Sequence, residues 1–512
     1  MTSAGPTDGQ GAGLAALEAR VRQDLAYLNR PPPNWVPPRR LDEERVHDVV
    51  VIGGGMCGLV AWHALQSGGV RDVRVLDRAD PGREGPWLTY ARMETLRSPK
   101  QLTGPAFGIG SLTFRAWFTV QFGEAAWEVL DKIPRPMWMD YLRWYSRVLE
   151  APVENRVELT KVSEERGCLR LALAGEGAHE HAILARKLVM ATGREGTGRP
   201  NIPGFVDALP ASLWAHSSED IDFAALRGRR VAVVGVGASA VDNAAEALEA
   251  GASEVRLLIR RTEMPTINKM MGIGSFGFTA GYATLPDEWR WRFMHYSFAT
   301  QTPAPRGSTL RVSRHDNAFF HFGKAVRNVR VAGDALDVRF ADGSRLETDF
   351  LILGTGFHTD PMARTELGAA AGEIRLWRDA YTPAADERDD ELGRFPYLGP
   401  DFAFRERRAG AAPWLRDVYC FNYGAAASLG KVSGDIPGIS EGAAWLAREI
   451  AATLYREDVE LHWQAMQDYA KPELEGDEWV ASELPGDEAT IASTDGSPLE
   501  ESEPSRCSGS FG

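Results

Sequence analysis

The same local pattern occurs twice in this chain: a run of β-branched residues, a glycine turn and an alanine-rich stretch. The first copy is HDVVVIGGGMCGLVAWHAL and the second is RRVAVVGVGASAVDNAAEAL. A continuously apolar strand that leads through a glycine loop into a helix is typical of the opening of a Rossmann βαβ unit, whose parallel strands are buried on both faces. Two such units predict two dinucleotide sites.

The first glycine loop predicts an FAD site. Gly53 permits the tight turn, Gly55 lets the backbone approach a pyrophosphate, and Gly58 allows close packing of helix on strand. The N-terminus of the helix then faces the phosphates. Asp77 closes the next strand, nineteen residues after Gly58. A carboxylate at this point is expected to accept hydrogen bonds from a ribose.

The second loop contains Gly235, Gly237 and Ala240, and it predicts an NADPH site. The strand that follows ends in Arg260 and Arg261, where an NAD enzyme usually has a carboxylate. A guanidinium suits the 2′-phosphate of NADPH because it can donate two parallel hydrogen bonds. The alternative is that both arginines are solvated on a turn.

Two later segments, KLVMATG and DFLILGTGF, are expected to be strands that return to the two sheets. The expected fold class is therefore α/β, with two Rossmann-like dinucleotide-binding domains and the NADPH domain inserted into the FAD domain. The expected parts are an N-terminal helix with a proline-rich linker (1–45), the FAD domain in two parts (46–204 and 346–470), the NADPH domain (205–345) and an acidic tail (471–512). The tail is poor in apolar residues and is expected to be disordered.

Composition narrows the class of protein. A chain of 512 residues is too long for one hydrophobic core, and its residues are 44% hydrophobic and 25% charged, as in a globular protein. It has neither a membrane-length apolar run nor a secretory signal, which predicts a cytoplasmic location without membrane contact. Most of the net charge of -14 lies in the tail, so no basic surface for nucleic acid is expected.

The four cysteines are Cys57, Cys168, Cys420 and Cys507, and no two of them form a C-x-x-C pair. This spacing argues against a disulfide framework and against a metal site of the zinc type. It also argues against a disulfide reductase, whose chemistry needs two neighbouring thiols.

Residues 46–450 resemble the class B flavoprotein monooxygenases, which comprise flavin-containing, Baeyer–Villiger and N-hydroxylating enzymes. The resemblance rests on GGGMCG, GVGASAVD, DFLILGTGF and the order of these segments. It implies that NADPH reduces FAD and that molecular oxygen then forms a C4a-(hydro)peroxyflavin, which oxygenates a small molecule. A flavin reductase or oxidase without oxygen transfer and a non-catalytic dinucleotide-binding regulator are the alternatives.

Within that group, METLRSPKQLTGPAFGIGSLTFRAWF is similar to a segment of the N-hydroxylating enzymes, and it assigns Lys100 to a substrate carboxylate. The alternative for Lys100 is a lysine that faces solvent. His216 in LPASLWAHSSED fits part of the signature of the other two branches, or it is a linker histidine. Trp87 stands where the family places a tryptophan near the cofactor, in a basic segment with Arg92 and Arg97 that suits an anionic substrate or the cofactor phosphates.

Near the C-terminus, FNYGAAASLGKVSGDIPGISEGAAWLAREIAATL reads as a strand end, a loop and a helix with Asp435 as its N-cap. In related flavoproteins the N-terminus of this helix points at the flavin, where its partial positive charge stabilises the reduced anion. Asn422 is the expected contact to the flavin or the substrate. The alternative is an asparagine that satisfies the backbone of its own turn.

For the substrate, the segment similar to the N-hydroxylating enzymes favours an amine or amino acid in natural-product metabolism. Baeyer–Villiger oxidation and S-oxygenation are the alternatives. The sequence is compatible with a monomer and with an oligomer.

Overall fold

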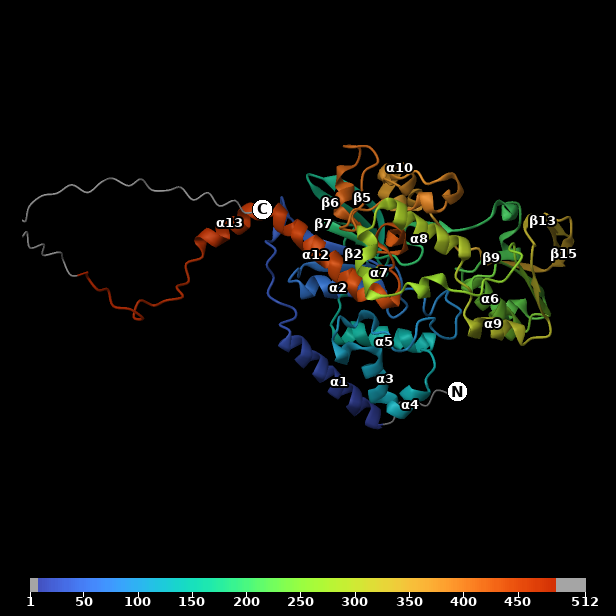
Figure 1. Ribbon diagram of the computed structural model, residues 1–512, viewed down its shortest axis with the longest axis horizontal. Coiled ribbons are helices and arrows are strands. Elements are labelled where there is room, and N and C mark those ends of the chain that lie inside the picture. The colour runs from blue at the N-terminus through green and yellow to red at the C-terminus, as the bar shows by residue number, and fades with distance from the viewer. Residues whose placement is uncertain (1–7, 485–512) are drawn as a thin grey trace, which may run out of the picture. The chain divides into compact units, whose positions relative to one another are not determined.

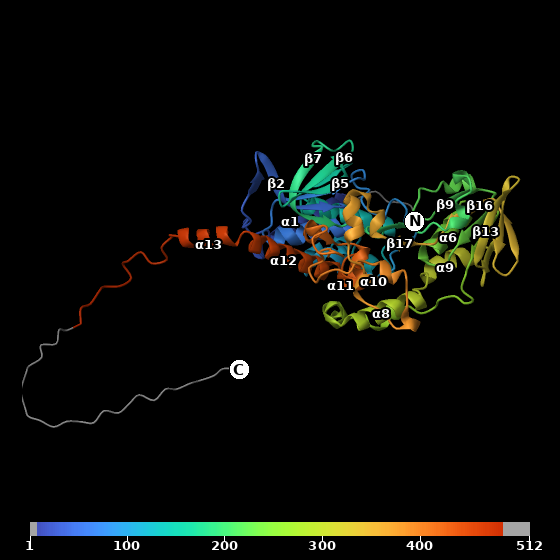
Figure 2. The same ribbon diagram turned by 90° about the horizontal axis from the view of Figure 1, so that it is seen from above.

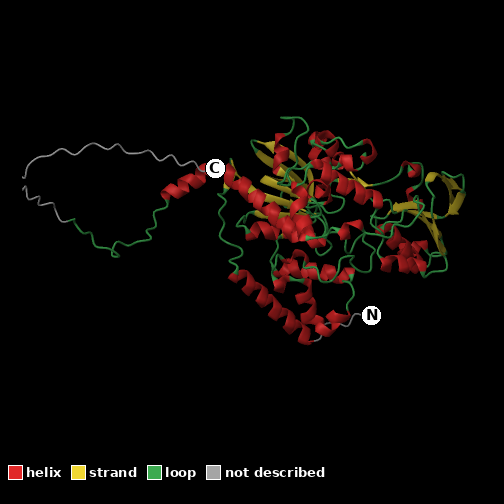
Figure 3. Ribbon diagram, viewed as in Figure 1, coloured by secondary structure: helices red, strands yellow, loops and turns green. Residues whose placement is uncertain are grey.

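The structure is a computed structural model, and it describes residues 8–484. It divides the chain into a large unit that ends at Val459 and a C-terminal unit that begins at Glu460. Figure 3 distinguishes the helices from the strands. The α-helices are α1 (Asp8–Tyr27), α2 (Met56–Ser67), α3 (Phe114–Phe122), α4 (Glu124–Val129), α5 (Arg135–Val148), α6 (Ala238–Glu249), α7 (Phe276–Gly281), α8 (Asp287–Thr300), α9 (Arg306–Ser313), α10 (Trp377–Ala380), α11 (Ala426–Leu429), α12 (Ile439–Glu457) and α13 (Val459–Asp468).

The larger sheet contains the first glycine motif. Its strands are β1 (Arg39–Leu41), β2 (Glu44–Ile52), β3 (Val73–Asp77), β4 (Val153–Asn155), β5 (Glu158–Glu165), β6 (Cys168–Ala174), β7 (Ala182–Met190) and β18 (Val418–Cys420). They follow the order β4-β3-β2-β7-β6-β5, with β1 beside β2 and β18 beside β7. The pairs of β2 with β3 and β7, of β3 with β4 and of β7 with β18 are parallel. The centre of β2 is fully buried, as its unbroken apolar run predicts.

The second sheet contains the second glycine motif. Its strands are β9 (Trp214–His216), β10 (Arg230–Val234), β11 (Glu254–Leu258), β12 (Ala318–His321) and β16 (Phe350–Leu353). All neighbours in the order β12-β11-β10-β16-β9 are parallel. The smaller sheets are an antiparallel sheet of β13 (Val326–Ala332), β14 (Ala335–Phe340) and β15 (Arg345–Thr348) and an antiparallel pair of β8 (Gly198–Pro200) and β17 (Phe357–Thr359).

The predicted insertion of one nucleotide-binding fold into the other is confirmed. The chain leaves the larger sheet after β7 and returns to it only at β18, and every strand of the second sheet lies between them. Figures 1 and 2 show β9, β13 and α6 grouped together and apart from β2, β6 and β7. The expected end of the inserted domain at residue 345 is wrong, because β16 pairs with β10 from Phe350 onward. The inserted sheet therefore extends to Leu353.

The ends of the chain agree in part with the sequence. The expected N-terminal helix is α1, which packs on α3 and buries Leu17 and Val21. The proline-rich linker ends earlier than expected, because β1 pairs with β2. Of the acidic tail, residues 471–484 are exposed without helix or strand, and residues 485–512, with Cys507, lie outside the described residues. None of the helices in residues 8–484 is both long and apolar enough to cross a membrane.

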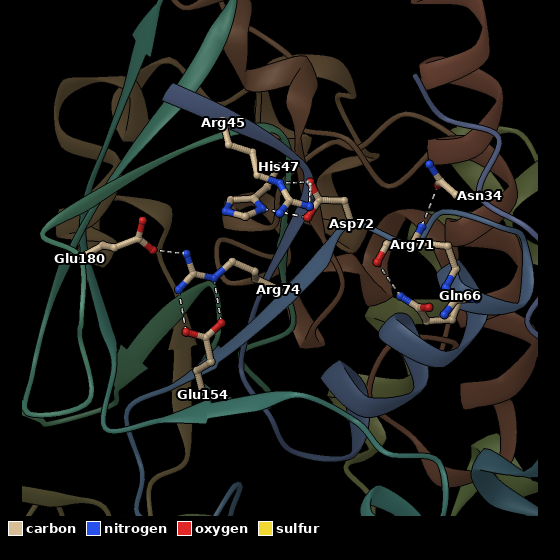
Figure 4. A network of polar contacts seen from close by, with 9 residues as sticks. All are labelled: Asn34, Arg45, His47, Gln66, Arg71, Asp72, Arg74, Glu154 and Glu180. Carbon is tan, nitrogen blue, oxygen red and sulfur yellow. Dashed lines mark hydrogen bonds and ion pairs between the residues drawn. The ribbon is translucent and has the colours of Figure 1, made fainter. Parts of the chain in front are cut away.

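Ion pairs at one edge of the larger sheet hold β3 in place. Arg74 of β3 pairs with Glu154 of β4 at 2.6 Å and with Glu180 at 2.6 Å, and Figure 4 shows the guanidinium between the two carboxylates. The parallel register of these strands sets Asp77 at the carboxyl end of β3, opposite Asn155. This is the edge at which α/β folds bind their ligands.

The buried Asp48 of β2 gives a first prediction. Burial, with the neighbouring Asp72, raises the pKa of Asp48 from 3.8 to about 7. The folded state therefore binds this proton more tightly than the unfolded state, so stability falls by about 1.4 kcal/mol per pH unit between the two pKa values and levels off above the higher one. We expect the unfolding free energy of Asp48→Asn to exceed that of the wild type by a margin that grows from pH 5 to about pH 7 and then levels off, as measured by urea denaturation.

The exposed Asp334 supplies the matched control, since Asp334→Asn is expected to leave the pH dependence of stability unchanged. A margin between Asp48→Asn and the wild type that stays constant from pH 5 to pH 8 would contradict the assignment of this titration to Asp48.

Candidate functional site

The first glycine loop leaves room for a phosphate at the start of α2. Gly55 is the N-cap of α2, and no side chain caps the helix, so its first N–H groups have no side-chain partner. Gly53 has a φ of +105°, and a Cβ on Gly58 would lie 1.7 Å from the carbonyl oxygen of Gly53. A Cβ on Gly55 would meet nothing closer than the backbone of Gly85 at 3.6 Å. The fold itself requires Gly53 and Gly58, whereas a Cβ on Gly55 would make only ordinary contact with the backbone of residues 84 and 85.

Asp77 is held against this loop. One carboxylate oxygen accepts the N–H of Gly54 at 2.6 Å and the other accepts the N–H of Ala79 at 2.7 Å. Each oxygen keeps a further lone pair. The two bonds fix the orientation of the carboxylate, and the expected contact to a ribose stays a prediction.

The second loop repeats this geometry. Gly237 is the N-cap of α6, again without a side-chain cap, and Gly235 has a φ of +117°. Ala240 is fully buried, and a Cβ on Gly354 would lie 2.4 Å from the Cβ of Ala240. The first turn of α6 therefore packs directly on the turn that follows β16. The start of the helix is left open to a phosphate.

The two arginines after β11 differ in their surroundings. Arg261 donates to the side chain of Gln301 at 2.8 Å and to the carbonyl oxygen of Ala299 at 3.0 Å. Arg260 is exposed, and it makes no hydrogen bond or ion pair with any residue from 8 to 484. Only Arg260 has its full set of donors free for a phosphate. Gln301 in turn lies beside the loop, 3.7 Å from the position of a Cβ on Gly237.

The basic segment of residues 85–100 joins the two loops. It begins with Gly85, which faces Gly55. Further along, Arg92 donates to the carbonyl oxygen of Glu219 at 3.0 Å, and the carbonyl oxygen of Arg92 accepts from Arg311 of α9 at 3.0 Å. The segment therefore crosses from the first nucleotide loop to the inserted fold.

Arg97 of this segment lies between the two nucleotide-binding folds. Desolvation lowers the pKa of its guanidinium, and the carboxylates of Asp242 and Asp435 oppose this shift. Asp242 belongs to α6 of the inserted fold, while Asp435 precedes α12 of the outer one. The side chain donates to the carbonyl oxygen of Pro303. Its remaining N–H groups have no protein partner among the described residues.

Trp87 is half-buried, with its ring 6.3 Å from that of Trp138 in an edge-to-face contact. Its carbonyl oxygen accepts from Arg135. These contacts place the indole at the margin of the aromatic core, and its expected contact with the cofactor stays a prediction.

Lys100 has a structural environment in place of the expected contact with substrate. It is 9% exposed, and its ammonium donates to the carbonyl oxygens of Trp127 and Glu128, at the end of α4. The ammonium also lies 4.9 Å from the ring centre of Trp127. A cation here satisfies the free carbonyl groups of a helix C-terminus. The alternative of a lysine facing solvent is equally excluded.

This environment predicts that Lys100→Met lowers stability without affecting substrate binding. Methionine keeps the apolar stem but loses the two charge-assisted hydrogen bonds, so we expect the unfolding free energy to fall by about 1 to 3 kcal/mol. Urea denaturation and steady-state KM measure the two effects, and Lys161→Met on exposed β5 is the matched control. A raised substrate KM at unchanged stability would return Lys100 to the substrate site.

His216 is fully buried in β9, and both of its ring nitrogens have partners. Nε2 lies 2.9 Å from the carbonyl oxygen of Gly356 and Nδ1 lies 2.7 Å from the hydroxyl of Ser218. Because a carbonyl only accepts, Nε2 carries the proton and donates. Desolvation also lowers the pKa of the ring. His216 is therefore a structural residue of the strand end, and we remove it from the catalytic candidates.

Asn422 forms hydrogen bonds with backbone groups, in agreement with the alternative that the sequence analysis gave for this residue. Its Nδ2 donates to the carbonyl oxygen of Met190 at 2.9 Å, and its Oδ1 accepts from the hydroxyl of Thr197 at 2.6 Å and from the N–H of Gly424 at 2.9 Å. The side chain is fully buried. It joins the carboxyl ends of β7 and β18 and has no group free for the flavin or the substrate.

Asp435 does not cap the long C-terminal helix. It precedes a 3₁₀ turn, Ile436–Gly438, its side chain accepts no capping hydrogen bond, and α12 begins only at Ile439 with Gly438 as its N-cap. Asp435 is exposed and lies 3.6 Å from the ammonium of Lys431. The proline lies in the 3₁₀ turn, and the α-helix begins only after this turn. The expectation that Asp435 is the N-cap of the long helix is therefore wrong.

Asp242 is a functional candidate that the sequence reading missed. It is 3% exposed, one of its carboxylate oxygens has no hydrogen-bond partner among residues 8–484, and burial raises its pKa to about 6. The side chains of Ser308 and Arg311 oppose the shift. The sequence does contain a signal for this residue. It is a carboxylate two residues after Ala240, on a helix face that is otherwise apolar.

Two sequence comparisons found proteins that are similar to this chain. Residues 50–272 match the family described as pyridine nucleotide-disulphide oxidoreductase. The chain is 39% identical over 466 residues to the FAD-dependent urate hydroxylase of Xanthomonas campestris pv. campestris. This match covers 90% of this chain and 98% of that protein.

Solved structures show the same fold at low identity. The reduced form of the ornithine hydroxylase of Pseudomonas aeruginosa has a TM-score of 0.59 at 18% identity, over 80% of this chain and 99% of that one. The ornithine N-hydroxylase of Kutzneria sp. 744, solved with reduced FAD, NADP⁺ and L-ornithine, has a TM-score of 0.59 at 18% identity, over 81% and 100%. At this identity the likeness establishes the architecture alone.

Proposed function

Because this chain belongs to the flavoprotein monooxygenase family that includes the FAD-dependent urate hydroxylase of Xanthomonas campestris, we propose that it hydroxylates urate or a closely related purine with FAD and NADPH. Membership confirms the expectation of a class B flavoprotein monooxygenase. The observation that carries the choice of substrate is the match along nearly the whole length of that relative.

The residues of the first loop fit FAD. The start of α2, which has no side-chain cap, and the fixed carboxylate of Asp77 match a pyrophosphate and a ribose. When bound and reduced, FAD supplies the activation of molecular oxygen, and the protein supplies position and a dry site. NADPH is assigned to the second loop, with Arg260 at its 2′-phosphate.

Arg97 is the residue that we propose to hold the substrate. Urate is a flat anion at neutral pH, and a guanidinium binds such an anion with parallel hydrogen bonds. Arg97 has free N–H groups and lies within the electrostatic reach of both Asp242 and Asp435, between the two nucleotide-binding folds. Asp242 and Arg97 together give the site one cation and one carboxylate that is largely ionised at neutral pH.

Hydroxylation of an amine nitrogen, which the sequence favours, is the second candidate. It is supported by the shared fold with the ornithine hydroxylases. The environment of Lys100 removes the residue that was expected to bind the carboxylate of an amino acid. For this reason we propose a purine as the substrate in preference to an amine.

The test measures coupled turnover. FAD-loaded protein is mixed with NADPH and air in the presence of urate, xanthine, L-ornithine or cadaverine, and NADPH oxidation, hydrogen peroxide and product mass are followed. We expect urate to stimulate NADPH oxidation with little peroxide and to take up one ¹⁸O atom from ¹⁸O₂. Arg97→Gln should raise the KM for urate, while Arg314→Gln, at an exposed position after α9, should not.

Three other outcomes are distinguishable. Coupled turnover with ornithine or cadaverine but not with urate would establish the second candidate. Peroxide formation with every compound would favour the oxidase alternative. Flavin that NADPH never reduces, with or without substrate, would favour the regulator.

A further inference from the structure

A cavity of about 420 Å³ lies in the part of the chain that connects the second sheet back to β18. Its lining comes from residues 360–407 and from β8, and it includes no residue of either glycine loop. Six charged side chains line it: Arg199, Arg378, Arg394, Arg407, Asp360 and Asp379. Four cations therefore face two carboxylates.

The two carboxylates only partly neutralise the positive charge of the arginines beside them. Arg199 lies 3.5 Å from Asp360, and Arg407 lies 3.7 Å from Asp379. Both distances exceed those of a direct N–H···O hydrogen bond. Each carboxylate also accepts a backbone N–H of its own turn, at 3.2 Å and 2.9 Å. In each carboxylate the backbone N–H and the arginine meet different oxygens, so one oxygen is shared with the backbone.

The other two arginines have no counter-charge. Neither Arg378 nor Arg394 makes a side-chain hydrogen bond or an ion pair with any residue in the described part of the chain. Arg394 is half-buried and Arg378 is exposed. An anion that enters the cavity would supply both guanidinium groups with a charged partner.

The rest of the lining is apolar. Pro361, Met362, Ile374 and Leu376 line the cavity, and Met362 is 62% exposed. A hydrated inorganic ion would leave this surface unused, whereas a ligand with an apolar body would bury it.

We propose that this cavity is a second ligand site, which binds a small organic anion with at least two negative charges on an apolar body. The charges are carboxylates or phosphates, because the guanidinium geometry matches both groups. The proposal does not depend on the substrate of the monooxygenase.

The test is calorimetric titration of the FAD-loaded protein at low ionic strength, with saturating NADP⁺ to fill the nucleotide site. Three anionic probes are compared: citrate, benzene-1,3,5-tricarboxylate and pyrophosphate. The two tricarboxylates carry the same charge, so we expect the benzene compound to bind at least about threefold more tightly than citrate through its apolar ring. Its neutral triamide should not bind.

The variant Arg378→Gln with Arg394→Gln should weaken binding by at least about tenfold. It should also fold normally, since neither side chain has a hydrogen bond or ion pair with a residue that the structure describes. Arg327→Gln with Arg330→Gln, on exposed β13, is the matched control and should bind like the wild type. Pyrophosphate that binds more tightly than citrate, through the same two arginines, would identify the charges as phosphates. Absence of binding by every probe, or equal affinity in the two double variants, would overturn the proposal.

Discussion

Gly55→Val is expected to give a folded protein that purifies without FAD. A Cβ at this position makes ordinary contact with the backbone of Gly85 at 3.6 Å, and the exposed turn at Gly85 can shift to admit the two methyl groups. The branched side chain would instead project in front of the open start of α2, where the pyrophosphate belongs. We expect FAD affinity to fall by at least about a hundredfold, equivalent to about 2.8 kcal/mol. The flavin absorbance of the purified protein and its fluorescence on titration with FAD measure this loss.

Two controls separate loss of the ligand from loss of the fold. Gly307→Val, on the exposed surface of α9 where a Cβ meets nothing within 4 Å, should retain FAD. Gly58→Ala should fail to fold, because its Cβ would lie 1.7 Å from the carbonyl oxygen of Gly53. Full FAD occupancy in folded Gly55→Val protein would show that the cofactor does not approach this loop.

The nucleotide loops were predictable because local backbone geometry dictates them. Gly53 and Gly235 adopt positive φ values, and the strand segments directly before them, Val49–Ile52 and Val231–Val234, are apolar. A short stretch of sequence contains all of that information. The same holds for the insertion of one fold into the other, since each return strand repeats the apolar pattern.

The roles of single polar side chains were not predictable in this way. Lys100 is satisfied by carbonyl groups of residues 127 and 128, His216 by Gly356, and Asn422 by Met190. These partners are between 27 and 232 positions away along the chain. Whether a polar group is free for a ligand depends on such distant partners, and spacing alone does not reveal them. Asp242 illustrates the converse, because its missing partner becomes visible only once the packing of α6 is known.

We expect the preference for NADPH over NADH to depend on Arg260, so that Arg260→Ala reduces this preference. The 2′-phosphate adds nearly two negative charges, and a charge-assisted hydrogen bond contributes roughly 1.5 to 3 kcal/mol, or about ten- to hundredfold in affinity. Arg260 is exposed and has no hydrogen bond or ion pair with the described part of the chain, so its loss should leave the fold intact. We expect the KM for NADPH to rise by about that factor and the KM for NADH to change by less than about threefold.

Arg261→Ala should behave differently, although the two residues are adjacent. Arg261 holds Gln301, whose side chain lies beside Gly237 at the start of α6. The pyrophosphate of both nucleotides meets that point, so we expect Arg261→Ala to raise both KM values together and to leave the preference nearly unchanged. Steady-state kinetics of NADPH and NADH oxidation on both variants decide the matter. If Arg260→Ala leaves both KM values unchanged, Arg260 stays in solvent when the nucleotide binds, and the assignment of the 2′-phosphate to this residue is wrong.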